Sequence, residues 1–321
     1  MSLTIIEKLP LIMTAKYCLS IIILFAVFSG GIFCALADET GTRGAVSDTI
    51  DSRGLHIALV PEKNIFEQRR RYHYITDYLS ENLGITVHVD IMHSYGQIIE
   101  AFLNGTADIG FFGSFSYVLT RSQAGVEPLV RPVWPDGSST YRSYIFVRKD
   151  SGIRTTADMK EKTLALVDRA TTAGYIFPLF YFKNIGIKDI RNHFAHIYFA
   201  GSHDIAAWAV YMGEADVGGC KSTIFNALAK EYPDFGDQMV TLIESVEVPS
   251  NCLAVSKDLR PLLKLRLKGL LLNLDASEEG KSILAQFGAK KFIVTTDEDY
   301  QVLYKMIDAL NIDLTKYSYK K

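Results

Sequence analysis

The chain has 321 residues, of which 34 are basic and 36 acidic, giving a formal net charge of −2. At about 150 residues per domain, this length predicts two domains or lobes. A content of 48 % hydrophobic and 22 % charged residues excludes a disordered, collagenous or coiled-coil chain, and the lack of a basic excess argues against a nucleic-acid partner.

The first 37 residues differ in composition from the rest. Two lysines precede an uncharged stretch rich in Ile, Leu and Phe, which ends in small residues at Ala35 and Ala37. This order predicts a signal peptide over residues 1–37 and therefore export. The alternative is an uncleaved membrane anchor, because about 21 uncharged residues could just span a bilayer. The polar residues 38–53 predict a linker.

Strands and helices alternate after the linker. In chain order, the hydrophobic pattern predicts a strand over 55–60, a helix over 66–82, a strand over 85–91, a helix over 94–103, a strand over 107–111, a strand over 163–167, a helix over 172–184, a strand over 195–198, a helix over 203–212 and a strand over 215–218. Such alternation predicts an α/β fold with mixed, mainly parallel sheets and helices on both faces.

One pattern occurs twice, at a constant offset of 108 residues. The segment from Ser94 to Gly110 recurs from Ser202 to Gly218, and each copy has a serine cap, a helix, a glycine stop and a short strand. Although Ala-Asp-Ile/Val-Gly after a helix is common in α/β proteins, so many matches in one register predict two lobes of similar build.

The residues that begin the predicted helices favour anion binding. In an open α/β sheet, ligands lie at the carboxyl ends of the strands, where helices start. Tyr95 and His203 stand at equivalent helix starts and are expected to face one cleft. Helix N-termini carry unpaired N–H groups and a partial positive charge. Thr171 and Thr172 open a third helix, where they could bind an anion or simply cap the helix.

Four segments are together similar to the phosphonate/phosphite/phosphate-binding proteins of ABC importers. They are Asp108–Tyr117, Tyr141–Ser143 leading to Val147–Ile153, the Thr-Thr-Ala-Gly turn followed by Tyr175–Pro178, and Gly201–Asp204. The resemblance implies a two-lobed type II periplasmic-binding-protein fold with a hinged ligand cleft. It also implies a first lobe over 54–143 plus 250–321 and a second lobe over 144–249.

The same resemblance implies a set of ligand-binding residues. They are Tyr95, Ser114, Ser116, Tyr141, Thr171, Thr172, His203 and Asn251. Each also has a structural interpretation, for example Tyr95 as a core aromatic or Ser114 as a helix cap. The resemblance implies that members which bind aminoalkylphosphonates have two carboxylates to pair with the ligand ammonium. In this chain the aligned positions are Thr223 and Asn251, which carry no carboxylate. A ligand ammonium would therefore be unpaired, which is costly, so a compact oxyanion fits better, and Lys221 could add positive charge.

The predicted function is the periplasmic solute-binding component of an ABC importer, a monomer that captures a small oxyanion and docks on a permease. No catalysis, cofactor or metal is expected: His193 and His196 lack further zinc ligands at suitable spacing. One alternative is an input protein for a membrane sensor receptor. Another is an exported enzyme on the same fold, with His203 beside Cys220. Cys220 and Cys252 could be bridged or free.

Overall fold

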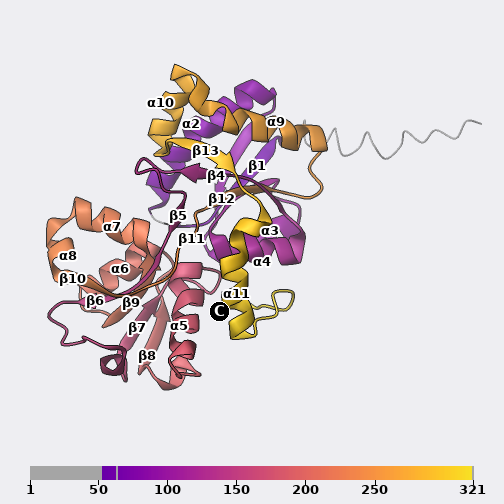
Figure 1. Ribbon diagram of the computed structural model, residues 1–321. Helices are drawn as coiled ribbons and strands as arrows, with labels where there is room; N and C mark the ends of the chain where they lie inside the picture. Colours follow the sequence, from indigo (N-terminus) through magenta and orange to yellow (C-terminus); the bar gives the residue numbers. More distant parts are fainter. Residues whose placement is uncertain (1–52, 63, 320–321) are drawn as a thin grey trace, which may run out of the picture. The chain divides into compact units, whose positions relative to one another are not determined.

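The computed structural model describes residues 53–62 and 64–319, which all belong to one compact unit. The predicted signal peptide and nearly all of the predicted linker lie outside these residues. The predicted alternation of strands and helices is found (Figure 1), and it builds two sheets joined by a short two-stranded one.

The first lobe is built on a six-stranded sheet in the order β13-β4-β12-β3-β1-β2. Its strands are β1 (Leu55–Leu59), β2 (Val87–Ile91), β3 (Ile109–Phe112), β4 (Glu127–Val133), β12 (Cys252–Val255) and β13 (Lys291–Val294). One face packs on α2 (Ile65–Leu83), α9 (Pro261–Leu272) and α10 (Glu278–Phe287). The other face packs on α3 (Tyr95–Leu103) and α4 (Ser114–Ala124), with α11 (Gln301–Leu310) in the same hydrophobic cluster.

The second lobe is built on a five-stranded sheet in the order β10-β6-β9-β7-β8. Its strands are β6 (Ser143–Arg148), β7 (Thr163–Leu166), β8 (His196–Phe199), β9 (Val217–Lys221) and β10 (Met239–Glu244). The π-turn η2 (Thr172–Ile176) and α5 (Phe177–Asn184) pack on one face. The other face packs on α6 (His203–Tyr211), α7 (Ser222–Glu231) and α8 (Pro233–Gln238).

Four short 3-10 turns complete the described elements. They are η1 (Thr156–Met159), η3 (Ile190–Asn192), η4 (Leu274–Ala276) and η5 (Asp297–Tyr300). Two of them, η1 and η5, begin with a capping box. In each, the side chain of a threonine accepts a hydrogen bond from the backbone N–H of the aspartate three residues later, and the side chain of that aspartate accepts one from the backbone N–H of the threonine. These turns fix where the chain leaves one element and enters the next.

The chain crosses between the lobes through a pair of antiparallel segments. Strand β5 (Thr140–Tyr141) leads from the first sheet to the second, and β11 (Val248–Pro249) leads back. The two segments pair with each other, with Tyr141 opposite Val248. This double crossing gives the predicted two-lobed arrangement. The exact lobe boundaries at residues 143 and 250 stay a prediction.

The expectation of mainly parallel sheets is wrong. Among the strand pairings of the described part, four are parallel and six are antiparallel. Four of the six antiparallel pairings come from the strands next to the crossings: β12 lies between β3 and β4 and runs antiparallel to both, and β6 does the same between β9 and β10. The other two are β13 with β4 and β5 with β11. The alternating pattern predicted only the βαβ parts, which are parallel.

The sequence repeat is a structural repeat. Ser94 and Ser202 each accept a hydrogen bond from the backbone three residues later and so cap α3 and α6. The carboxylates of Asp108 and Asp216 each accept a backbone N–H at 2.9 Å, from the start of β1 and of β7 respectively. The same hydrogen bonds therefore place Tyr95 and His203 at the first position of equivalent helices.

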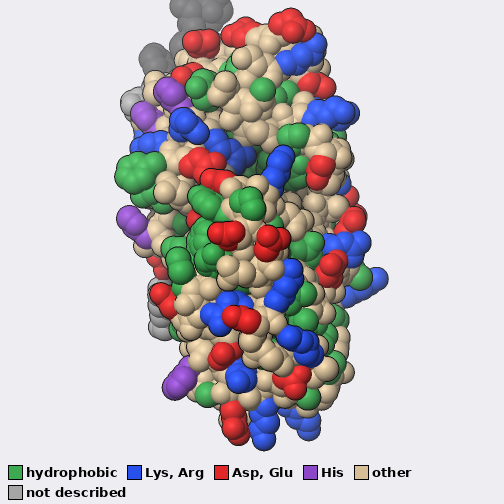
Figure 2. All heavy atoms as spheres, turned by 90° about the vertical axis from the view of Figure 1, so that its left-hand side faces the viewer, with side chains coloured by type: hydrophobic (Ala, Val, Ile, Leu, Met, Phe, Trp, Pro, Cys, Tyr) green, Lys and Arg blue, Asp and Glu red, His purple; other side chains and the backbone are tan. Residues whose placement is uncertain are grey.

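The surface carries charges of both signs. On the face shown in Figure 2, Lys and Arg side chains alternate with Asp and Glu side chains over the whole height of the molecule. Within residues 53–62 and 64–319, no helix is both long and apolar enough to span a bilayer.

Candidate functional site

Six side chains follow the carboxyl ends of the parallel strands. Glu62, Tyr95 and Ser114 follow β1, β2 and β3 in the first lobe, and Thr172, His203 and Lys221 follow or end β7, β8 and β9 in the second. Because the carboxyl ends of neighbouring parallel strands lie at one edge of a sheet, each lobe presents its three residues at a common edge. Four of these six positions were predicted as ligand-binding residues.

Tyr95 and His203 meet as the repeat predicts. Their rings lie edge to face, with centroids 6.2 Å apart, and the two residues are only 1 % and 4 % exposed. The Tyr95 hydroxyl is buried and has no hydrogen-bond partner among the residues described. The starts of α3 and α6 are therefore brought together from different lobes, with one unsatisfied donor between them.

His203 is a neutral hydrogen-bond donor. Burial lowers its pKa to about 3, and the nearby Lys221 ammonium acts in the same direction, although Glu62 opposes them. The backbone N–H of Lys221 donates to Nδ1 of His203 at 3.3 Å. Because Nδ1 accepts, the single proton of the neutral ring is on Nε2. The imidazole can thus donate at Nε2 without carrying a charge.

Ser114 and Tyr141 tie the start of α4 to the crossing segments. The hydroxyl of Ser114 donates to the carbonyl of Pro249 at 2.7 Å, so its 2.9 Å contact with Tyr141 must have the phenol as donor. Burial raises the pKa of Tyr141 to about 12, against the opposing hydroxyls of Ser114 and Thr172. These two hydrogen bonds connect the start of α4 to β5 through Tyr141 and to β11 through Pro249.

The remaining predicted hydroxyls divide into free and engaged groups. Thr172 Oγ1 is buried and has no well-formed hydrogen bond in the described part of the chain. By contrast, the hydroxyl of Thr171 donates to the carbonyl of Asp168 at 2.6 Å, and that of Ser116 donates to the carbonyl of Gly113 at 3.0 Å. The hydroxyl protons of Thr171 and Ser116 are therefore already used in local hydrogen bonds, and Thr171 does not cap η2 with its side chain.

Backbone N–H groups add to these donors. The N-cap residue is Gly113 in α4 and Thr171 in η2. Within the described residues, neither N-cap side chain accepts a hydrogen bond from the first backbone N–H groups of its element. The first N–H groups of a helix have no partner inside the helix. At these two starts they can therefore bind an anion.

An ion pair that the sequence analysis did not predict crosses between the lobes. Lys221 Nζ lies 3.1 Å from Oε1 of Glu62, and it also donates to Oδ1 of Asn251. Burial alone would raise the pKa of Glu62, but Lys221, Asn251 and His203 outweigh burial and lower it. Lys221 was expected near the cleft, whereas Glu62 was missed. The available signal was its position: Glu62 follows β1 in the first lobe as Thr172 follows β7 in the second.

A pocket of about 480 Å³ opens beside this ion pair. Its walls come from both lobes: Glu62, Arg71 and Trp134 from the first, and Lys221, Thr223 and Lys230 from the second. The pocket therefore places the ion pair at a boundary between solvent and the buried donors.

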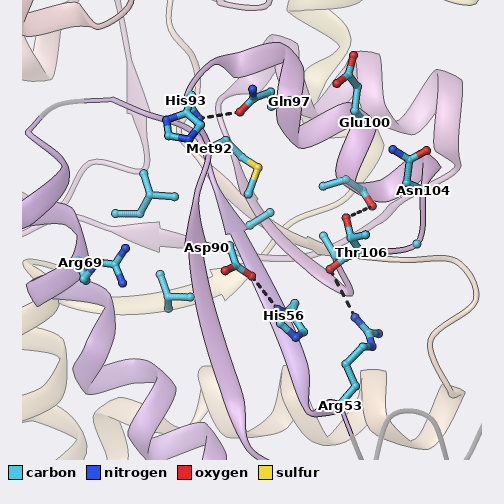
Figure 3. A pocket seen from close by; sticks show the side chains of 16 residues that line it. Arg53, His56, Arg69, Asp90, Met92, His93, Gln97, Glu100, Asn104 and Thr106 are labelled. Carbon is cyan, nitrogen blue, oxygen red and sulfur yellow. Dashed lines mark hydrogen bonds and ion pairs between the residues drawn. The ribbon is translucent and has the colours of Figure 1, made fainter.

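A second pocket, of about 810 Å³, lies apart from these residues, along β1, β2 and α3 (Figure 3). There His56 Nδ1 lies 2.7 Å from Oδ2 of Asp90, and Arg53 donates to the carbonyl of Thr106. It contains none of the predicted ligand-binding residues.

Cys220 and Cys252, the two cysteines within the described residues, are free and buried, so the disulfide that the sequence allowed between them is not formed. Burial raises the pKa of Cys252 to about 12 and that of Cys220 further. A thiol must lose its proton to act as a nucleophile. Cys220 is thus unsuited to the role that the enzyme alternative needs.

The described fold and the site at the junction of its lobes define a two-lobed α/β protein of the type II periplasmic-binding class. The family model for the periplasmic substrate-binding protein of phosphonate ABC transporters matches residues 57–300. This chain therefore belongs to the phosphonate-binding periplasmic protein family of ABC transporters, whose members bind and deliver solutes and are not enzymes. The predictions of the family, of the two-lobed α/β fold with mixed sheets and of the function as a transporter binding component are confirmed.

Individual relatives agree with this family. The phosphate-import protein PhnD of Mycolicibacterium smegmatis is 27 % identical over 66 % of this chain and 69 % of its own length. The phosphonates-binding periplasmic protein of Escherichia coli is 25 % identical over 68 % of this chain and 65 % of its own. The structure of PhnD1 from Prochlorococcus marinus in complex with methylphosphonate covers 80 % of this chain and 98 % of its own, at 21 % identity and a TM-score of 0.71.

Proposed function

We propose that this chain captures a small phosphorus oxyanion, such as phosphate, phosphite or a short alkylphosphonate, between its lobes. The observation that carries the proposal is a group of buried neutral donors drawn from both lobes: the hydroxyls of Tyr95 and Thr172 and the imidazole of His203. Hydrogen bonds to an ionised oxygen are stronger than neutral ones. Such donors hold an anion firmly and still release it, because no covalent bond forms.

The unsatisfied donors support an anionic ligand. Within the described residues, the hydroxyls of Tyr95 and Thr172 and Nδ2 of Asn251 are buried without a partner. A buried polar group without a partner costs about 1–3 kcal/mol, and an oxyanion with several acceptor oxygens would remove that cost at all three. Ser114 and Tyr141 would fix the hinge, and Thr171 and Ser116 would shape the turns that offer backbone N–H groups.

The ligand class is supported by the relatives, one named for phosphate import and one for phosphonates, and by the solved homologous structure that holds methylphosphonate. We further propose that the chain is exported with cleavage after Ala37 and works as a monomer that docks on an inner-membrane permease. The mass of the exported chain decides between this cleavage and an uncleaved anchor.

Replacing one donor tests the site. Thr172→Val keeps the shape of the side chain and removes its hydroxyl, and Tyr95→Phe does the same for the phenol. We expect each variant to bind methylphosphonate at least tenfold more weakly, because a charge-assisted hydrogen bond contributes about 1.5–3 kcal/mol. Isothermal titration calorimetry on residues 38–321 with phosphate, phosphite, methylphosphonate and sulfate measures both the ligand class and the loss.

Thr120→Val is the matched control. Thr120 is a buried threonine in α4 whose hydroxyl donates to the carbonyl of Ser116 at 2.6 Å, so this variant loses a hydroxyl outside the donor group and should keep its affinity. Unchanged affinity in both Thr172→Val and Tyr95→Phe would rule out this site.

A further inference from the structure

The Glu62–Lys221 ion pair lies where the proposed oxyanion site needs no charge. The side chain of Lys221 is 5 % exposed and that of Glu62 19 % exposed, and the two residues lie 159 positions apart in the chain. Lysine is almost never fully buried unless it is paired. The neutral donors described above can hold an anion without this pair, so it requires an explanation of its own.

The groups around the Lys221 ammonium form a subsite for a primary amine. A carboxylate oxygen of Glu62 and the amide oxygen of Asn251 accept its hydrogen bonds, and Nζ lies over the face of the Tyr141 ring, 4.6 Å from the ring centroid. Oxygen acceptors together with an aromatic face are what a protein uses to bind a ligand's ammonium. Here the bound ammonium is tethered to the end of β9.

This subsite shares side chains with the oxyanion donors. Asn251 turns Oδ1 to Lys221, while its Nδ2 is without a partner in the part of the chain described. Tyr141 turns its ring face to Lys221 and its hydroxyl to Ser114. The backbone N–H of Lys221 donates to His203. The ammonium subsite and the oxyanion donors are therefore immediate neighbours.

We propose that Lys221 is a specificity-determining residue, a built-in ammonium that fills the amine subsite beside the oxyanion site. This inference rests on the proposed function and names its ligand class more closely: phosphorus oxyanions that carry no amine. An aminoalkylphosphonate would bring a second ammonium against the first, where Glu62 is already paired. Like charges and unpaired charges are a common way for a protein to reject a ligand.

Space for an amine exists once Lys221 is shortened. The pocket of about 480 Å³ that includes Glu62, Lys221 and Thr223 adjoins the ion pair. Truncation of Lys221 at Cβ would join this pocket to the subsite. It would also leave the Glu62 carboxylate without its cation, so that a ligand ammonium could replace the lost one.

Lys221→Ala should therefore change the ligand preference. The probes are methylphosphonate, 2-aminoethylphosphonate and propylphosphonate, which carries a methyl group in place of the ammonium. We expect the wild-type chain to bind methylphosphonate at least tenfold more tightly than 2-aminoethylphosphonate. In Lys221→Ala, 2-aminoethylphosphonate should bind at least tenfold more tightly than it does to the wild type, and at least tenfold more tightly than propylphosphonate. Calorimetry measures each affinity.

Two further variants separate charge from space. Lys221→Ala combined with Glu62→Gln keeps the added space and removes the carboxylate, so its preference for 2-aminoethylphosphonate over propylphosphonate should fall below threefold. Lys264→Ala removes another lysine paired with a carboxylate, at 2.9 Å from Glu127 in the first lobe, and should leave the wild-type preference unchanged.

Two results would overturn the inference. One is a wild-type chain that binds 2-aminoethylphosphonate as tightly as methylphosphonate, a measurement that needs no variant to fold. The other is a folded Lys221→Ala that gains no affinity for 2-aminoethylphosphonate. A wild-type chain that binds no phosphorus oxyanion contradicts the proposed function instead. Methylammonium chloride then tests the subsite alone: it should raise the melting temperature of Lys221→Ala but not of the double variant, and no rise contradicts the subsite.

Discussion

At the scale of single residues, the proposed site contains a histidine that burial keeps uncharged. His203 is buried at the start of α6, and burial lowers its pKa to about 3. An unfolded histidine titrates near 6.5. Between these two values the unfolded chain binds a proton that the folded chain does not. Burial of the neutral imidazole therefore lowers the free energy of unfolding as the pH falls below about 6.5. At neutral pH both the folded and the unfolded chain hold the imidazole mainly in its neutral form, so this loss of stability is absent.

His203→Gln should remove this loss of stability in acid. As the pH falls below about 6.5, the free energy of unfolding of the wild type should drop relative to that of His203→Gln by up to about 1.4 kcal/mol per pH unit, because glutamine takes up no proton. Urea denaturation at pH 7, 6 and 5 measures the difference. His196→Gln, an exposed substitution on β8, is the control. Parallel pH curves for the wild type and His203→Gln would contradict the buried neutral imidazole.

At the scale of elements, the turn that presents Thr172 departs from the expected structure. The sequence predicted one helix over 172–184, but the chain first makes a π-turn, η2, and then α5. The backbone of η2 approaches the end of β7 closely: a Cβ on Gly174 would lie 2.4 Å from Cβ of Val167, and the Val167 N–H donates to the Gly174 carbonyl at 3.0 Å. Widened turns of this kind are frequent at functional sites.

Gly174→Ala should therefore destabilise both the turn and the site. The new methyl group would overlap Val167 and come within 2.9 Å of Oγ1 of Thr171, so we expect a loss of about 1–3 kcal/mol in the free energy of unfolding and weaker methylphosphonate binding. Gly269→Ala in α9, where nothing lies within 4 Å of the new Cβ, should stabilise by about 0.5–1 kcal/mol. Urea denaturation of the pair is the measurement, and equal effects would refute the close approach.

At the scale of the whole described unit, the C-terminal segment also connects the two lobes. Gln123 of α4 donates to the carbonyl of Leu314 at 2.9 Å. Three residues further on, the Tyr317 ring packs edge to face on Phe115, and its hydroxyl donates to the carbonyl of Arg169 in the second lobe at 2.7 Å. The segment thus holds α4 and the chain before η2 in one arrangement.

Tyr317→Phe tests whether this connection favours the ligand-binding arrangement. The variant keeps the ring and removes a hydrogen bond worth about 1 kcal/mol, so methylphosphonate affinity should fall about fivefold. Tyr304→Phe removes a comparable hydrogen bond, to Asp297 at 2.9 Å within the first lobe, and should leave affinity unchanged. Equal affinities for the two variants in calorimetry would show that the connection does not bias the lobes.

Much of the architecture follows from local patterns. Helix periodicity and the serine caps placed α3 and α6 to within a residue, and the offset of 108 residues predicted that Tyr95 and His203 are equivalent. The family resemblance supplied the two-lobed fold. The direction of β6 and β12 was not predicted, because an isolated strand sequence carries no sign of whether its neighbours run with it or against it.

The sequence by itself determined which residues begin the helices at the carboxyl ends of the strands, because capping and periodicity act over a few residues. Only the tertiary structure decided how those residues are used. Thr171 and Thr172 are adjacent and identical in the sequence, but the hydroxyl of Thr172 has no partner among the described residues, whereas that of Thr171 donates to a nearby carbonyl. Glu62 pairs with Lys221, which lies 159 positions away in the chain. Such pairings depend on how two lobes meet, and contacts between distant segments leave no local pattern in the chain.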